Sequence, residues 1–428
     1  MATKISGPYD IIVSQPSHSW LSGVANLFTQ EFFEIVKGNL TERGVFSQWL
    51  NLYNMDEAVL KSIMRTFYSV FPHGVVFTDR NDQEMIMIGS MSPVRFHWQK
   101  LEAMTQNPTL QANLSQLPFN DAFSFLSVYT ASRQTVMEET KGAKLNTDIN
   151  AFAEASQSSL FYSAKDLHGV PQSFLSSLFK ARYSDFVTGI NTKDPTFLYN
   201  QAMKLLSLNK IDKFLTVVDE FERISSTDQN QHERIGYLML MVQRYASADH
   251  YLRSAVKSNA NTQATGYLAS SLIQQNKFSE AISLLATHNG KNQSLDCLKA
   301  DALHKTGVKL SQNKALKSIL KEKSAYRENC GIYFDKLLGQ HFFSIGQYSE
   351  ALPYLESYYQ SYPTDETNIQ QLVTAYLQTG DQKNWQAFSS YYQTVSEQNK
   401  LRKKDLSEYF KLNGYNEDMK ALKNLPVL

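Results

Sequence analysis

Two polar residues, Gln15 and His18, follow closely on the first apolar run of the chain, YDIIV from Tyr9 to Val13, and one of them could take part in acid–base chemistry. The His18 imidazole can accept a proton near neutral pH, whereas the Gln15 amide can neither accept a proton nor supply negative charge. A histidine in such a position is also typical of a solvent-facing loop, and position alone does not separate the two readings. The elements around the pair therefore decide what it can do.

The first part of the chain alternates strand and helix patterns. A β-branched run at Tyr9–Val13, helical spacing at Asn26–Leu40 and a second apolar run at Gly44–Leu50 predict a β-α-β unit. Gln15 and His18 are then expected in the loop between the first strand and its helix.

A second helix and a hairpin are expected next. Helical spacing at Asp56–Tyr68, with Asn54 or Asp56 as the cap, predicts the helix. Two strand-like runs, Val75–Thr78 and Met85–Ile88, are joined by a polar link suited to an antiparallel hairpin. These patterns predict a parallel sheet with an antiparallel edge, followed by a mostly helical segment up to about residue 190.

Four phrases carry a resemblance to a known family: YDIIVSQPSHSWLSGVANLFTQEFFEIV from Tyr9, GVFSQWLNLY from Gly44, IGSMSPV from Ile88 and LNTDINAF from Leu145. In this order they resemble the fused membrane-domain/spermidine synthase family, in which a transporter-like region precedes a polyamine aminopropyltransferase-like domain. The resemblance implies an incomplete Rossmann-like module, of methyltransferase and spermidine synthase type, over residues 1–155. It also implies that the cofactor-holding strands and the membrane region lie outside this chain.

The resemblance also assigns candidate site residues. Spermidine synthases carry an Asp-x-x-Asp-Pro loop in which a carboxylate accepts a proton from the attacking amine, and Gln15 and His18 stand at the matching positions. Gln48, Asn146 and Asp148 match positions that line the substrate pocket, although a strand-end glutamine bonded to a loop and an Asn-Thr-Asp turn or cap explain them equally well. No cofactor is expected in this chain alone; decarboxylated S-adenosylmethionine would be the co-substrate of a completed site.

From about Asp194 onward the helical pattern is continuous and repeats, with NKFSEAI at Asn276 and GQYSEAL at Gly346 as close copies. The copy at Leu338–Pro363 resembles the tetratricopeptide repeat, with Gly339 at a close approach of two helices. Seven turn residues recur about 34 residues apart, the period of that repeat: Asn209, Gln243, Asn276, Gly307, Gly346, Gly380 and Gly414. We therefore expect a helical linker over 156–193 and a tetratricopeptide-like α-solenoid over 194–428.

The net charge and the cysteine content exclude some classes of function. The chain has 42 basic and 41 acidic residues and a formal charge of +1, so no nucleic-acid partner is expected. Cys297 and Cys330 lack metal-ligand spacing and predict neither a disulfide framework nor a zinc site, which favours a reducing compartment. The expected location is cytoplasmic, or at the inner membrane through a membrane region outside this chain.

Two functions remain open on this evidence. The first is an aminopropyltransferase-related protein with a helical-repeat interaction domain and an incomplete active site, so whether it is an enzyme stays undecided. The alternative is a non-catalytic tetratricopeptide-type scaffold. In both, the repeats would bind a protein or peptide partner, and the partner of the α/β module would be its missing N-terminal half or membrane domain.

Overall fold

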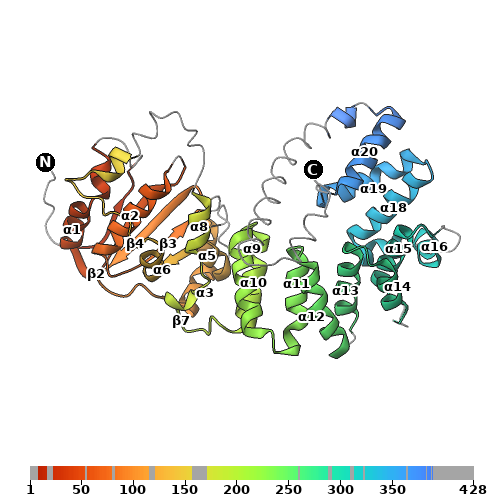
Figure 1. The fold of residues 1–428 in the computed structure, drawn as a ribbon, viewed down its shortest axis with the longest axis horizontal. Coiled ribbons are helices and arrows are strands. Elements are labelled where there is room, and N and C mark those ends of the chain that lie inside the picture. The colour runs from red at the N-terminus through yellow and green to blue at the C-terminus, as the bar shows by residue number, and fades with distance from the viewer. Residues whose placement is uncertain are drawn as a thin grey trace. The chain divides into compact units, whose positions relative to one another are not determined.

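The computed structural model describes residues 8–16, 23–53, 55–79, 82–114, 121–156, 171–258, 261–287, 292–308, 313–321, 323–362, 365–381, 383–386 and 388. The chain divides into two compact units, Met1–Ile224 and Ser225–Leu428 (Figure 1). The first combines a sheet with helices and the second is helical, so the mixed α/β class with a helical C-terminal region is confirmed. The division falls later in the chain than the boundary expected at residue 194.

A five-stranded mixed sheet forms the centre of the first unit, in the order β1-β2-β4-β3-β6. β1 and β2 run parallel on either side of a helical connection, which confirms the predicted β-α-β unit. β3 and β4 form the predicted antiparallel hairpin, with Thr78 paired to Met85. The bounds are β1 (Tyr9–Ser14), η1 (Ala25–Phe28), α1 (Gln30–Gly38), β2 (Leu40–Asn51), β3 (His73–Thr78), β4 (Glu84–Ser90) and β6 (Tyr129–Ser132).

The expected parallel sheet with an antiparallel edge is wrong. Within the described sheet, the β2–β4, β3–β4 and β3–β6 pairs are all antiparallel. The link between β3 and β4 is too short for a crossover helix, so β4 must return antiparallel to β3, and it then pairs with β2 on its other side. β6 lies in a segment expected to be helical, and its four residues are all buried.

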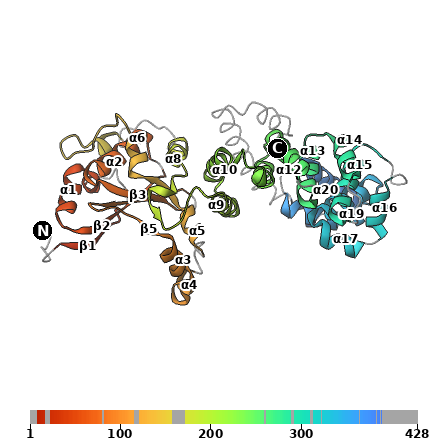
Figure 2. The same cartoon turned by 90° about the horizontal axis from the view of Figure 1, so that it is seen from below.

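Helices α1 and α2 (Glu57–Val70) cover one face of the sheet, and Figure 2 shows them with α6 on that side. The carboxylate of Asp56 accepts hydrogen bonds from two backbone N–H groups at the start of α2, so one of the two predicted caps is confirmed. Aromatic rings fill the space beneath: Phe67 lies 5.1 Å from Phe33 and 5.7 Å from Phe46 between ring centroids.

The opposite face is covered only toward β3 and β6. There Phe77 meets Phe125 from α5, with 5.7 Å between the ring centroids. Toward β1 the same face is open in the described part of the chain, and Ile11, Val13 and Ile86 are 69%, 67% and 40% exposed. The covering elements are β5 (Phe96–His97), α3 (Trp98–Gln106), α5 (Ala122–Ser127), η2 (Tyr183–Asp185) and β7 (Val187–Thr188), and α4 (Pro108–Leu114) packs on α3.

The segment expected as a helical linker belongs to the first unit where it is described. Phe174, Leu175 and Leu178 of one helix are buried in the same core as the aromatic rings of α1 and α2. Their helix therefore packs with the sheet. The helices that precede and form this segment are α6 (Arg133–Glu139) and α8 (Gln172–Leu178).

The helix pair α9 (Pro195–Ser207) and α10 (Ile211–Ser225), expected to open the repeats, is attached to the sheet by two lysines, Lys210 directly before α10 and Lys213 within it. The Lys210 ammonium donates to Asp79 O at 2.8 Å and Asp82 Oδ1 at 2.9 Å at the hairpin turn. The Lys213 ammonium donates to Tyr129 O at 2.6 Å on edge strand β6, and also to Ser127 O and Thr130 Oγ1. These contacts explain why the first unit extends to Ile224.

The second unit is built from helices joined by tight turns. Six of the seven predicted turn residues, one of them (Asn209) in the first unit and five in the second, adopt the left-handed conformation, with φ between 56° and 78°, and Gly414 lies outside the described residues. The turns predicted at these six positions are confirmed. The helices are α11 (His232–Met241), α12 (Tyr245–Ser258), α13 (Thr262–Gln274), α14 (Phe278–Ala286), α15 (Gln293–Lys305), α16 (Lys314–Lys321), α17 (Lys323–Cys330), α18 (Ile332–Ser344), α19 (Tyr348–Ser361) and α20 (Glu366–Thr379), after the short η3 (Gln229–Gln231).

Glycine permits the close approach expected of two helices in the second unit. A Cβ at Gly339 of α18 would lie 2.7 Å from the Leu355 side chain and 3.2 Å from its backbone nitrogen on α19. Gly236 of α11 meets Leu252 of α12 in the same way, with a side-chain carbon at 2.5 Å. Ala351 of α19 is fully buried, and Pro363 lies outside the described residues. A larger side chain at either glycine would push its helix pair apart.

The two cysteines form a disulfide, which corrects the expectation from their spacing. Cys297 on α15 and Cys330 on α17 are 33 residues apart and bonded to each other. That separation is close to one repeat, and the packing of α15 against α17 brings the two together. The cysteines therefore no longer favour a reducing compartment. None of the described helices combines the length and the apolar character that crossing a membrane requires.

Candidate functional site

The residues predicted to form a site lie at or near the carboxyl edge of the β1–β2 pair, where described. Gln15 directly follows β1 and is exposed. Gln48 lies within β2, opposite Ser14, and is fully buried. His18 lies outside the described residues. The structure therefore places Gln15 toward solvent and Gln48 in the core, and it gives them different surroundings.

Gln48 is held by its own strand. Its amide nitrogen donates to Trp49 O at 3.0 Å, and its buried Oε1 has no partner among the described residues. A neutral amide cannot accept a proton in catalysis. In this arrangement Gln48 contributes polarity inside the core, and its side chain does not reach a solvent-filled pocket.

Asn146 is buried and forms hydrogen bonds with three separate segments of the first unit. Its amide nitrogen donates to Phe28 O at 3.1 Å, and its Oδ1 accepts from Ala153 N at 3.0 Å. Its backbone N–H donates to Thr66 Oγ1 at 2.8 Å, and the residue is 1% exposed. With three partners in three segments, Asn146 joins η1, helix α2 and the stretch of chain around Ala153.

Asp148 is exposed on the turn after Asn146. Its backbone N–H donates to Glu31 Oε2 at 3.0 Å in the first turn of α1. The Asn146–Asp148 turn is thus brought to the start of α1, which by topology lies at the carboxyl edge of β1 and β2. The structure brings this turn close to the predicted edge, but among the described candidates only Asp148 carries a charge.

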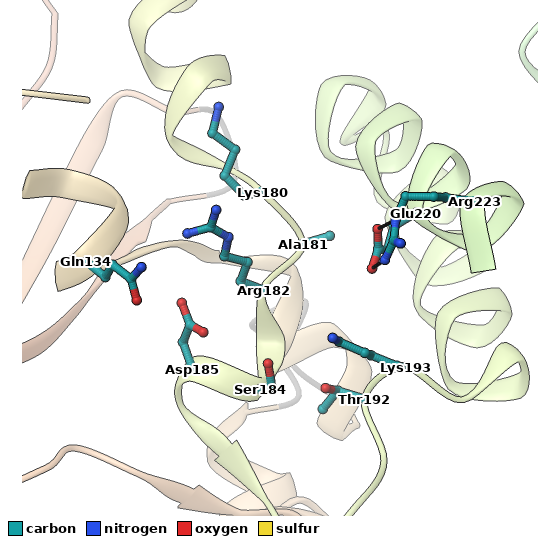
Figure 3. A pocket seen from close by; sticks show the side chains of 10 residues that line it. All are labelled: Gln134, Lys180, Ala181, Arg182, Ser184, Asp185, Thr192, Lys193, Glu220 and Arg223. Carbon is teal, nitrogen blue, oxygen red and sulfur yellow. Dashed lines mark hydrogen bonds and ion pairs between the residues drawn. The ribbon is translucent and has the colours of Figure 1, made fainter. Parts of the chain in front are cut away.

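A polar cavity of about 420 Å³ lies elsewhere in the first unit (Figure 3). No residue in it was a candidate from the sequence. Its lining comes from four separate stretches of the chain, the start of α6, the segment around η2, the turn before α9 and the end of α10: Gln134, Lys180, Ala181, Arg182, Ser184, Asp185, Thr192, Lys193, Glu220 and Arg223. The close pair Lys180 and Arg182 is the only local signal, because tertiary packing assembles the rest.

Ion pairs surround this cavity. Arg223 donates through two nitrogens to the two carboxylate oxygens of Glu220, each at 2.7 Å, and this contact raises the pKa of the guanidinium. The Gln134 amide donates to Glu138 at 2.9 Å; this hydrogen bond, followed by the charge of Arg182, lowers the pKa of the Glu138 carboxyl. The cavity wall is therefore charged near neutral pH.

Ala181 has an uncommon backbone between two of these charged residues. Its φ of 52° is in the left-handed region, which L residues other than glycine, asparagine and aspartate seldom adopt. Its side chain is buried while Lys180 and Arg182 on either side are exposed. This local conformation is consistent with both cations lining one cavity, as Figure 3 shows.

In the described part of the chain, no group of three or more His, Cys, Asp or Glu side chains is placed so that it could hold a metal ion. No protein-family model matches the chain, and a search of the curated proteins finds no match. The resemblance to aminopropyltransferases therefore rests on the sequence motifs, and the arguments about function rest on the residues themselves.

Proposed function

We propose that this chain is a non-catalytic relative of the polyamine aminopropyltransferases, and that its helical C-terminal unit binds a protein partner. The observation that carries the proposal is the state of Gln15 and Gln48 at the predicted site. The first is an exposed neutral amide and the second is a buried one. Gln15 therefore does not provide the carboxylate that the related enzymes carry at its position, and Gln48, at a position that lines their substrate pocket, adds no charge.

The chemistry of aminopropyl transfer explains why these amides matter. The attacking amine must lose a proton, and the polyamine substrate is positively charged. A carboxylate accepts the proton and attracts the cation, whereas Gln15 does neither. Asp148 is the charged described candidate, but its exposure keeps its field weak. Decarboxylated S-adenosylmethionine would be the co-substrate only of a completely assembled site.

The helix pairs support partner binding. The close approaches at Gly236 and Gly339 and the left-handed turns between helices resemble the stacking of tetratricopeptide repeats, whose extended surfaces bind proteins. Two aliphatic side chains of this unit are well exposed, Ile345 at 53% and Leu377 at 65%. Exposed apolar side chains on such a scaffold are candidates for contact with a partner.

The catalytic half of the proposal is tested by incubating the full chain with decarboxylated S-adenosylmethionine and a diamine. We expect mass spectrometry to detect no aminopropylated product. Turnover above a protein-free control would refute the non-catalytic assignment and leave the binding role as a separate question.

The binding half is tested by chemical cross-linking and mass spectrometry of the full chain in an extract of its source cells. We expect reproducible cross-links to one protein, which map to residues 225–428 and weaken in Leu377→Asp. Ile149→Asp is the matched control, because Ile149 is 95% exposed but lies in the first unit. Equal weakening in both variants, or cross-links confined to the first unit, would refute a partner site on the helical unit.

A further inference from the structure

We propose that the polar cavity in the first unit binds a small organic anion that carries phosphate or carboxylate groups. Four of its lining side chains are cationic, Lys180, Arg182, Lys193 and Arg223, and two are anionic, Asp185 and Glu220. Two positive charges in the lining are therefore not balanced within it. Outside the lining, Glu139 pairs with Lys180 and Glu138 with Arg182, so an anion would bind by replacing these exposed pairs and by meeting the Lys193 ammonium.

The two lining acids are already engaged. Glu220 is bound on both oxygens by Arg223, which neutralises this pair. Asp185 accepts a hydrogen bond from Ser132 Oγ at 2.7 Å. The excess charge thus resides on Lys180, Arg182 and Lys193.

Each of these three side chains has N–H groups that can donate hydrogen bonds to a bound anion. The Lys193 ammonium has no hydrogen-bond or ion-pair partner among the described residues. Lys180 contacts Glu139 at 3.1 Å and Arg182 contacts Glu138 at 3.3 Å, each through one nitrogen. A guanidinium has five N–H donors, so Arg182 can bind a further oxyanion. Ion pairs this exposed are weak, and a ligand can compete with them.

The chemistry of the lining selects the class of ligand. A guanidinium presents a planar fork that matches two oxygens of a carboxylate or phosphate, and an ammonium adds a point charge. The Ser184 and Thr192 hydroxyls and the Gln134 amide can donate to further oxygens. The volume of about 420 Å³ exceeds that of a single inorganic ion and suits a small metabolite. Asp185 would repel an anion nearby, so it favours a ligand that places a hydroxyl or amine against this carboxylate.

The proposal is tested by isothermal titration calorimetry of the full chain at low ionic strength. Inorganic pyrophosphate probes the phosphate source and citrate probes the carboxylate source. We expect saturable binding of at least one probe, and the stronger one identifies the oxyanion. Lys193→Met and Arg182→Gln should each weaken binding roughly tenfold or more, since each removes a charged donor. Lys100→Met, an exposed lysine of α3 outside the lining, is the matched control and should bind like the unmodified chain.

Two results would overturn the proposal. One is the absence of saturable heat with both probes up to about 10 mM, which is weaker than a specific site of this charge should give. The other is equal weakening in Lys100→Met and in the cavity variants, which would indicate non-specific attraction to surface charge. Circular dichroism verifies that each variant is folded. If Arg182→Gln does not fold, Lys193→Met decides the question, because the Lys193 ammonium has no hydrogen bond or ion pair within the described part of the chain.

Discussion

The ammonium of Lys213 is buried between α10 and the edge strand β6, and its replacement tests how the α/β unit is held together. It donates to Ser127 O, Tyr129 O and Thr130 Oγ1 at 2.6 to 3.1 Å. Burial lowers the pKa of this lysine to about 7, with a further lowering from Lys210, while Asp82 and Asp79 oppose the shift. Lys213→Met keeps the length of the side chain and removes the titrating group.

The direction in which pH changes the free energy of unfolding follows from the protonation of Lys213 in the folded and unfolded states. Above pH 7 the folded protein releases the proton of Lys213, whereas the unfolded chain keeps it up to the ordinary lysine pKa of about 10.4. The free energy of unfolding is therefore highest above the pKa of the unfolded chain, where Lys213 is neutral in both states. It falls as the pH drops toward 7, because the unfolded chain then binds a proton that the folded protein does not. The slope is at most about 1.4 kcal/mol per pH unit, so the free energy of unfolding should rise by about 2 kcal/mol between pH 7 and 9.

The assay is urea unfolding of the full chain and of Lys213→Met at pH 7, 8 and 9, followed by tryptophan fluorescence. The measured quantity is the free energy of unfolding of the wild type minus that of the variant, in which the other titrating groups cancel. We expect this difference to grow by about 2 kcal/mol across the range. Lys100→Met should show no such trend. A constant difference would mean that Lys213 stays protonated in the folded state, and it would refute the reasoning from burial.

Three further outcomes are expected. Gly339→Ala should lower the free energy of unfolding of the helical unit by about 1–3 kcal/mol, because the new Cβ meets α19 at 2.7 Å; Gly266→Ala, with its nearest atom at 3.5 Å, should be neutral or slightly stabilising in the same urea titration. Asn146→Ala should cost about 2–4 kcal/mol, because it leaves two buried backbone groups unpaired, and Asp148→Asn should leave the melting temperature unchanged. Cys297→Ser should destabilise the helical unit by about 2–4 kcal/mol through the loss of the cross-link, and a reducing agent should have the same effect on the wild type but none on the variant.

Local features of the fold could be predicted because they depend on residues close in sequence. The hairpin between β3 and β4 follows from two short apolar runs and a polar link, and the cap of α2 follows from one aspartate before a helical pattern. The turns at Asn209, Gly346 and Gly380 follow from their recurrence, since left-handed backbone favours glycine and asparagine. Each of these signals is contained within a few residues.

The candidate site could be predicted only in part. The resemblance pointed to Gln15 and Gln48, but burial separates them, and no local pattern reports burial. Asn146 carries three hydrogen bonds to segments up to 118 residues away in sequence, which a turn-like motif cannot indicate. The polar cavity was missed for the same reason, because its lining is assembled from four stretches of the chain.

The sequence by itself determined the order of the elements from β1 to β4, the two classes of structure along the chain and the positions of the turns between helices. Only the tertiary structure decided that β4 lies between β2 and β3, that α9 and α10 belong with the sheet, and that Cys297 meets Cys330. The physical reason is the range of the interactions. Turn and cap preferences act within a few residues, whereas strand order, buried lysine contacts and a disulfide depend on which distant surfaces pack together.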